Sequence, residues 1–195
     1  MKASCAKDRY NIGKVAFLLL ILCFLAMMIG CEPREQPPKE GEMALLVLSP
    51  AFQEGGKIPT KYTCQGQDVS LPLTWGDPPP GIGSFSLIVD DLDAPGGVFT
   101  HWILFNIPAD SRELPEAVPA QAQLASGTLQ GKNGFGRLGY GGPCPPPGRP
   151  HRYRFTLYAL DQPLDLKAGS SRKLVADSMK GHVIAQGQLT GTYQR

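Results

Sequence analysis

The clearest β-strand in the sequence is residues 153–160, which read Tyr-Arg-Phe-Thr-Leu-Tyr-Ala-Leu. Successive side chains of a strand point to opposite faces of its sheet. One face of this strand therefore holds Tyr153, Phe155, Leu157 and Ala159. The other face holds Arg154, Thr156, Tyr158 and Leu160. This alternation predicts a long strand of a β-sheet.

Two apolar runs upstream, Ser84–Val89 and His101–Ile107, predict strands of a different kind. Both are rich in Phe, Leu, Ile and Val, and neither shows a simple alternation of polar and apolar residues. A strand that is apolar on both faces belongs in a sheet that is covered on both sides. Shorter strand-like runs lie at residues 44–48, 71–75 and 186–193.

The remaining sequence is rich in turns and holds little helix. The 23 glycines and 19 prolines make up more than a fifth of the 195 residues, which favours a turn-rich β protein. Residues 108–138 are polar and irregular, and residues 170–184 predict one short amphipathic helix that Gly181 interrupts near its end. No internal repeat, heptad pattern or βαβ alternation is present. We therefore predict a mainly β, β-sandwich-like domain with at most two helices.

The charge of the chain argues against a nucleic-acid-binding protein. The formal net charge of +2 depends on the first 30 residues, which hold four basic residues and one acid. The rest of the chain keeps 15 of the 19 basic and 16 of the 17 acidic residues, a net charge of about −1. Proteins that bind nucleic acid usually present a basic face instead.

The N-terminus predicts an export signal. A basic segment runs to Lys14, and Val15–Ile29 is an uncharged apolar stretch. At ~1.5 Å per residue this stretch is short for a hydrocarbon core of ~30 Å, so it fits the apolar region of a signal peptide. It ends in Met-Ile-Gly-Cys at residues 28–31, which resembles the bacterial lipoprotein signal, in which the cysteine is lipidated and becomes the new N-terminus. A plain secretory signal and an uncleaved membrane anchor are the alternatives.

Three segments follow from this interpretation. Residues 1–30 are a lipoprotein-type signal peptide, residues 31–42 are a flexible tether rich in Pro and Glu, and residues 43–195, called the body below, form the folded domain. Lipidation at Cys31 would anchor the exported protein to a bacterial membrane, on its periplasmic side or at the cell surface.

Only two cysteines, Cys64 and Cys144, lie in the body. In an oxidising compartment, two such cysteines suggest one disulfide. A bridge that closes about 80 residues would stabilise the fold by about 4 kcal/mol in the chain-entropy model. Two buried free thiols are the alternative, because sequence does not give the geometry that a disulfide needs.

Two short polar segments carry most of the chemistry. The first is Asp-Leu-Asp-Ala-Pro at residues 91–95, with His101 and Trp102 just behind it. The second is Gly-Gly-Pro-Cys-Pro-Pro at residues 141–146, which leads into His151-Arg152-Tyr153. Each histidine stands where a loop rich in Pro or Gly enters a strand, so adjacent strands would bring both loops to one end of a sheet. Asx-turns for the aspartates and structural roles for the histidines are the alternatives.

Three chemistries fit a pocket made of two carboxylates and two imidazoles. Two histidines and two aspartates could hold a metal, but their spacing matches no metal-site signature. An Asp–His pair could act in acid–base catalysis, but no Gly-x-Ser-x-Gly motif supplies a nucleophile. Imidazoles and loop N–H groups could instead donate to phosphate oxygens, while the aspartates accept the other imidazole protons.

These segments resemble the phosphatidylethanolamine-binding protein family, whose bacterial members are often called Raf kinase inhibitor-like proteins. The resemblance extends from Leu45 to Tyr193 and includes Tyr-Thr-Cys-Gln-Gly at residues 62–66 and Lys-Gly-His-Val-Ile-Ala at residues 180–185. One departure is Leu92, where many members have proline. The resemblance implies a large central antiparallel sheet, a smaller sheet packed on it, and one or two peripheral helices.

The resemblance also implies an anion pocket. Carried over position by position, its residues are Asp91, Asp93, His101, Pro143, Cys144, His151 and Tyr153. Family members bind phosphate-bearing head groups and small anions, and some lineages bind kinases or proteases. Catalysis is not a general property of the family, and we predict neither a metal nor a cofactor.

The function predicted from sequence is that of a lipid-anchored, exported binding protein. Its partners would be a phosphate-bearing small molecule or lipid head group, the membrane through an N-terminal lipid, and a protein partner in some settings, but no nucleic acid. One alternative is a surface inhibitor of a protease or kinase-type partner. Another is a hydrolase that uses the Asp/His pocket on phosphoester or acyl substrates.

Overall fold

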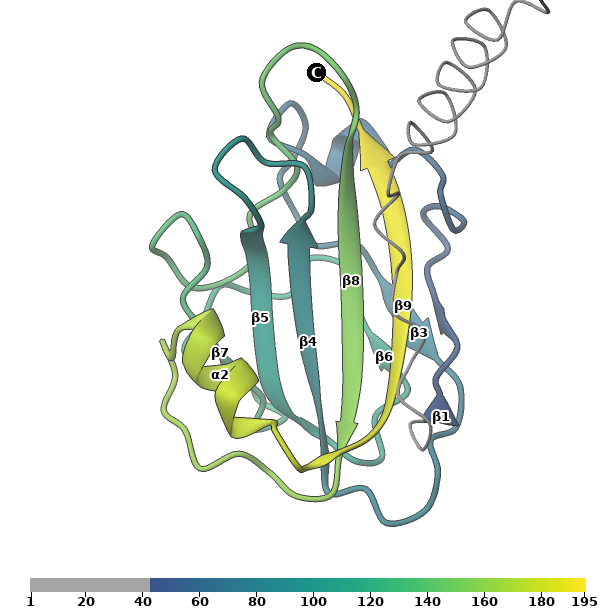
Figure 1. Cartoon of the computed structure of the whole chain (residues 1–195), viewed down its shortest axis with the longest axis vertical. Helices are drawn as coiled ribbons and strands as arrows, with labels where there is room; N and C mark the ends of the chain where they lie inside the picture. The colour runs from purple at the N-terminus through teal and green to yellow at the C-terminus, as the bar shows by residue number, and fades with distance from the viewer. Residues whose placement is uncertain (1–42) are drawn as a thin grey trace, which may run out of the picture. The chain divides into compact units, whose positions relative to one another are not determined.

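The computed structural model describes the body, residues 43–195 (Figure 1). The predicted signal peptide, the lipidation site at Cys31 and the tether lie outside the described residues. Of the described residues, no helix has the length and apolar character needed to cross a membrane.

Two β-sheets make up the domain, as predicted. The larger has six strands in the order β1-β9-β8-β4-β5-β7, and the smaller has three in the order β2-β3-β6. All neighbours are antiparallel except β1 and β9, which are parallel. The strands of the large sheet are β1 (Met43–Ala44), β9 (Val183–Tyr193), β8 (His151–Leu160), β4 (Ser84–Asp91), β5 (Phe99–Pro108) and β7 (Leu129–Gln130). Those of the small sheet are β2 (Val47–Leu48), β3 (Leu73–Trp75) and β6 (Glu113–Leu114).

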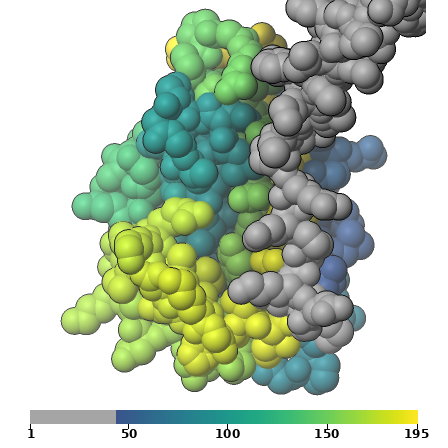
Figure 2. All heavy atoms as spheres, in the orientation of Figure 1, coloured from purple at the N-terminus to yellow at the C-terminus, as the bar shows by residue number. Residues whose placement is uncertain are grey.

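Two hydrophobic clusters cover the two faces of the large sheet. The first lies between the sheets and joins Phe155 and Leu157 of β8 to Trp75 of β3. The second lies under the α-helix α2 (Arg172–Ser178) and includes Ile103 of β5 and Val175 of the helix. In Figures 1 and 2, α2 and the chain around it lie over one face of the large sheet. Every residue of β4 is buried, which confirms that the apolar strands are covered on both sides.

Two boundaries differ from the sequence prediction. Residues 44–48 form two short strands in different sheets, because Leu45 donates to Gln186 of β9 while the carbonyl of Leu46 accepts from Gly76 beside β3. The helix predicted within residues 170–184 spans only Arg172–Ser178, and its early end agrees with the predicted break near Gly181. Gly181 has a φ of 82°, which breaks the helix and turns the chain into β9. A short 3-10 helix, η1 (Thr60–Tyr62), precedes β3.

Candidate functional site

The candidate site lies where β4 ends and β8 begins, at the upper end of the large sheet in Figure 1. We expected the two histidines to stand on adjacent strands. They do not, because β4 runs between β5 and β8. His101 is in β5, His151 opens β8, and Asp91 ends β4 between them. The last pair of β4 and β8 joins Asp91 to Tyr153. The site therefore forms around the end of one buried strand that its neighbours flank.

A β-bulge sets the direction of His101. The pairing of β4 with β5 runs from Val89 and Trp102 directly to Asp90 and Thr100, so His101 is the extra residue. In such a bulge, two successive side chains lie on nearly the same side of the sheet. His101 consequently packs against Tyr153, with the ring centroids 5.2 Å apart, on the face that also buries Trp102. Regular pairing would turn His101 toward the opposite face, where α2 lies.

Asp91 and His151 form a buried pair at the centre of the site. Oδ2 of Asp91 lies 2.8 Å from Nδ1 of His151, and only 6% and 5% of the two side chains is exposed. Oδ1 of Asp91 accepts from the backbone N–H of Asp93 at 2.9 Å, as in an Asx-turn. Because a carboxylate can only accept, Nδ1 of His151 carries the proton and donates. The Asp91 carboxylate therefore fixes the ring, and Nε2 is the atom that His151 can offer to a ligand.

His101 is oriented by a backbone carbonyl instead of by an aspartate. Its Nδ1 lies 2.6 Å from the carbonyl oxygen of Gly141, so this nitrogen also carries a proton and donates. Burial lowers the pKa of His101 below its ordinary value, although the Gly141 carbonyl and the charge of Asp91 act in the opposite direction. The free protein thus holds this imidazole neutral at physiological pH, with a lone pair on Nε2.

Tyr153 presents a buried hydroxyl on the residue that packs against His101. Its side chain is fully buried, and the hydroxyl makes no well-aligned hydrogen bond in the part of the chain that the structure describes. Burial raises the pKa of Tyr153 above its ordinary value, and the negative charge of Asp91 and a weak hydrogen-bonding contact with its carboxylate act in the same direction, so the phenol remains a donor. A buried donor without a well-aligned acceptor costs up to about 1–3 kcal/mol, a cost that a bound acceptor would reduce.

Asp93 is placed differently from the prediction. Its carboxylate accepts from the backbone N–H of Arg152 at 2.9 Å and from the guanidinium of Arg152 at 2.9 and 3.1 Å, so it does not orient an imidazole. The hydrogen bonds from Arg152 lower the pKa of Asp93. The pair joins the loop after β4 to the start of β8 and holds Asp91 in register with His151.

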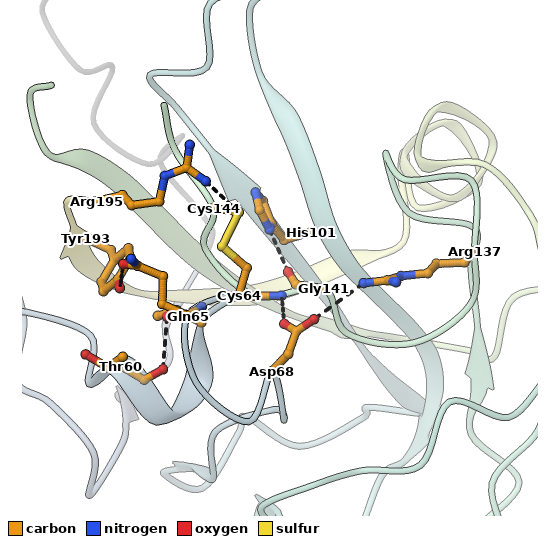
Figure 3. Close-up of a disulfide and its surroundings, with 12 residues drawn as sticks. Thr60, Cys64, Gln65, Asp68, His101, Arg137, Gly141, Cys144, Tyr193 and Arg195 are labelled. Atoms are coloured by element: carbon orange, nitrogen blue, oxygen red, sulfur yellow. Dashed lines mark hydrogen bonds and ion pairs between the residues drawn. A yellow bond between two sulfur atoms is a disulfide. The ribbon is translucent and has the colours of Figure 1, made fainter. Parts of the chain in front are cut away.

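The loop at residues 141–144 supplies the carbonyl that orients His101, and three contacts hold it (Figure 3). Cys144 forms a disulfide with Cys64. The backbone N–H of Cys64 donates to the carbonyl of Pro143 at 3.2 Å, and that of Gly142 donates to Asp68 at 2.6 Å. A Cβ on Gly142 would lie only 2.4 Å from the carbonyl oxygen of Tyr62, so this close approach requires glycine. Pro143 and Cys144 thus hold the loop in place.

Two residues of the site region were missed at the level of sequence. Asp68, whose carboxylate also lies 3.5 Å from Arg137, follows a Gln-Gly turn and carries no local signal of its distant partner Gly142. Asp90 points to the opposite face from Asp91 and there accepts from Thr100 at 2.7 Å and from Arg172 of α2 at 2.7 Å. The sequence motif centred on Asp91 did not indicate a role for Asp68 or for Asp90.

The residues present do not resemble a metal centre or a thiol-based active site. Within residues 43–195, no group of three or more His, Cys, Asp or Glu side chains could hold a metal ion. The disulfide takes up the sulfur of Cys144, the cysteine in the loop that orients His101. The arrangement offers a ligand the Nε2 atoms of two histidines, His101 and His151, and the phenol of Tyr153. These groups lie around the fixed carboxylate of Asp91.

Comparison with known proteins supports a specific family. The family model for phosphatidylethanolamine-binding protein matches residues 48–194. A protein of Methanothermobacter thermautotrophicus named "UPF0098 protein" is 51% identical over 145 residues, which cover 74% of this chain and 95% of that protein.

A solved structure and a second relative agree with this match. The crystal structure of Escherichia coli YbcL, described as a new member of the mammalian PEBP family, has a TM-score of 0.73 and 35% identity, covering 77% of this chain and 98% of that one. A Mycobacterium tuberculosis protein named "Putative lipoprotein LppC" is 38% identical over 158 residues, which cover 80% of this chain and 76% of that protein.

Proposed function

We propose that this chain, which belongs to the phosphatidylethanolamine-binding protein family, binds a phosphate-bearing ligand at the site formed by Asp91, His101, His151 and Tyr153 while anchored to a membrane by a lipid on Cys31. The ligand is a phosphorylated small molecule or a lipid head group. The site binds its ligand without a metal ion or a cofactor.

The observation that carries this proposal is the buried hydroxyl of Tyr153, which lacks a well-aligned acceptor, at the end of the sheet that also holds two oriented imidazoles. Protein acceptors hold Nδ1 of His101 and Nδ1 of His151, so both rings are fixed with Nε2 available. A phosphate has enough oxygens to accept from all three groups. Charge-assisted bonds from imidazolium to phosphate are stronger than neutral ones, and the buried setting strengthens them further.

The affinity of the site can be tested by calorimetric titration of inorganic phosphate and phosphorylethanolamine. We expect His151→Gln to weaken binding of both ligands about 10-fold to 100-fold, because it removes one charge-assisted bond of roughly 1.5–3 kcal/mol. Tyr153→Phe should weaken binding less, since the phenol donor is neutral.

His182→Gln is the matched control for this titration. His182 also pairs through Nδ1 with a carboxylate, that of Asp161 at 2.9 Å, but this pair is exposed and lies beyond the far end of β8. The control should bind as the wild type does. Equal affinity of wild type and His151→Gln would place the ligand elsewhere.

The lipid anchor rests on the signal at residues 15–31, on the tether and on the relative named as a lipoprotein. We expect Cys31→Ser, expressed in a bacterium with lipoprotein processing, to yield a soluble or unprocessed form. The wild type should start at Cys31 by mass spectrometry and partition with membranes. A Cys31→Ser protein that is cleaved yet remains wholly in the membrane fraction would contradict the anchor.

A further inference from the structure

A second cavity lies beside the candidate site. Its volume is about 350 Å³, and it is lined by Lys57, Pro150, Thr192, Tyr193, Gln194 and Arg195. Pro150 directly precedes His151, and Tyr193 is the partner of His151 in the pairing of β8 with β9. The cavity is therefore next to the histidine site, at the end of the sheet where the described chain ends (Figure 1).

The cavity is positively charged. The residues that line it include Lys57 and Arg195 and no Asp or Glu. Neither cation belongs to any of the ion pairs in the described part of the chain. The guanidinium of Arg195 instead donates to Sγ of Cys144 at 3.7 Å, which keeps it beside the disulfide (Figure 3). The two charges are thus free to act on a ligand.

Backbone hydrogen bonds hold the main chain on both sides of Lys57. The N–H of Ile58 donates to the carbonyl of Thr192 at 2.8 Å, and the N–H of Thr192 donates to the carbonyl of Gly56 at 2.8 Å. The hydroxyl of Tyr193, another lining residue, donates to Gln65 at 2.5 Å. These hydrogen bonds hold the backbone next to Lys57 and the side chain of Tyr193, so this part of the cavity is formed before a ligand arrives. A preformed cavity lowers the entropy cost of binding.

We propose that this cavity is a second anion subsite, so that the preferred ligand carries two anionic groups, one at the histidines and one between Lys57 and Arg195. The inference rests on the proposed function, because it assumes that the first group is held at the histidines. A phosphate diester with an acidic head group and a molecule with two phosphates share this chemistry.

A spacer series tests the subsite. Methylphosphonate carries one anionic group, and α,ω-alkane bisphosphonates with two to six methylenes carry two at increasing separation. We expect one spacer length to bind the wild type about fivefold to tenfold more tightly than methylphosphonate, a modest gain because both cations are exposed. The gain should shrink as salt is raised.

Matched variants separate the two subsites. Lys57→Ala and Arg195→Gln should abolish the gain of the best bisphosphonate and leave the affinity for methylphosphonate unchanged. Lys167→Ala removes an equally exposed cation from the segment between β8 and α2 and should keep the gain. His151→Gln should weaken both kinds of ligand.

Each outcome bears on a different claim. If methylphosphonate binds through His151 but no spacer improves on it, the second subsite is wrong and the proposed function stands. The second subsite is also wrong if the best bisphosphonate still binds more tightly than methylphosphonate in both Lys57→Ala and Arg195→Gln. If methylphosphonate and every bisphosphonate fail to bind the wild type, the proposed function fails and the subsite fails with it.

Discussion

Loss of the Cys64–Cys144 disulfide is expected to lower the free energy of unfolding by about 4 kcal/mol. The bridge joins residues 80 positions apart, so it removes much of the freedom of the unfolded chain. It also holds the loop whose Gly141 carbonyl orients His101, and its loss should therefore weaken phosphate binding as well.

Urea denaturation measures this effect, with the exported protein compared to a double variant, Cys64→Ser and Cys144→Ser. The midpoint should fall in the variant and in the reduced wild type, and a reductant should leave the variant unchanged. Intact mass after alkylation without reduction tests the pairing itself. Two labelled thiols in freshly exported, native protein would rule the bridge out.

Replacement of Asp91 is expected to have the second largest effect. Asp91→Ala removes the acceptor for a buried donor, Nδ1 of His151 at 2.8 Å, and for a partly buried one, the backbone N–H of Asp93 at 2.9 Å. Loss of these two bonds should cost about 3 kcal/mol of unfolding free energy. The freed His151 ring should also lose its orientation, so phosphate affinity should fall at least as far as in His151→Gln.

Asp161→Ala provides the comparison for this variant. It breaks the same kind of contact, with His182 at 2.9 Å, but about half of the Asp161 side chain and a third of the His182 side chain are exposed. An exposed ion pair contributes roughly 0–1 kcal/mol, so this variant should be nearly as stable as the wild type. If the two aspartate variants lost the same stability, Asp91 would not be the buried acceptor described above.

The sequence allowed much of the fold to be predicted because the strands carry their own patterns. The alternation over residues 153–160 and the apolar runs of β4 and β5 correspond to strands of the large sheet. The short elements were harder to predict. Residues 44–48 read as one strand, and only the distant partners Gln186 and Gly76 divide them between two sheets. Local sequence holds no information on such partners.

The candidate site could also be predicted only in part, because local sequence does not reveal which distant residues will be in contact. The motifs pointed to Asp91, His101, His151 and Tyr153, which the structure brings to one end of the large sheet. They did not reveal that a bulge at His101 turns its ring toward Tyr153, because a bulge depends on the register between strands. The role given to Asp93 was wrong in detail, since the guanidinium of Arg152 competes for its carboxylate more strongly than a neutral imidazole could.

We propose that bound phosphate contacts Nε2 of His101 and Nε2 of His151. Burial lowers the pKa of His101, so the free site must take up a proton at this ring, or receive one from the phosphate, before Nε2 can donate. Binding should therefore weaken as the pH rises, by about tenfold per pH unit for each proton taken up.

Two-bond ¹H–¹⁵N correlation spectra of the imidazoles, recorded while inorganic phosphate is added, test this claim most directly. The chain has only three histidines, His101, His151 and His182, so each ring can be assigned with one substitution. We predict that His101 begins as a neutral ring protonated at Nδ1 and gains a proton at Nε2 on phosphate binding, that the Nε2 signal of His151 shifts with it, and that His182 does not change. Spectra in which His101 and His151 keep their free-state signals at saturating phosphate would rule out contact between phosphate and these two rings.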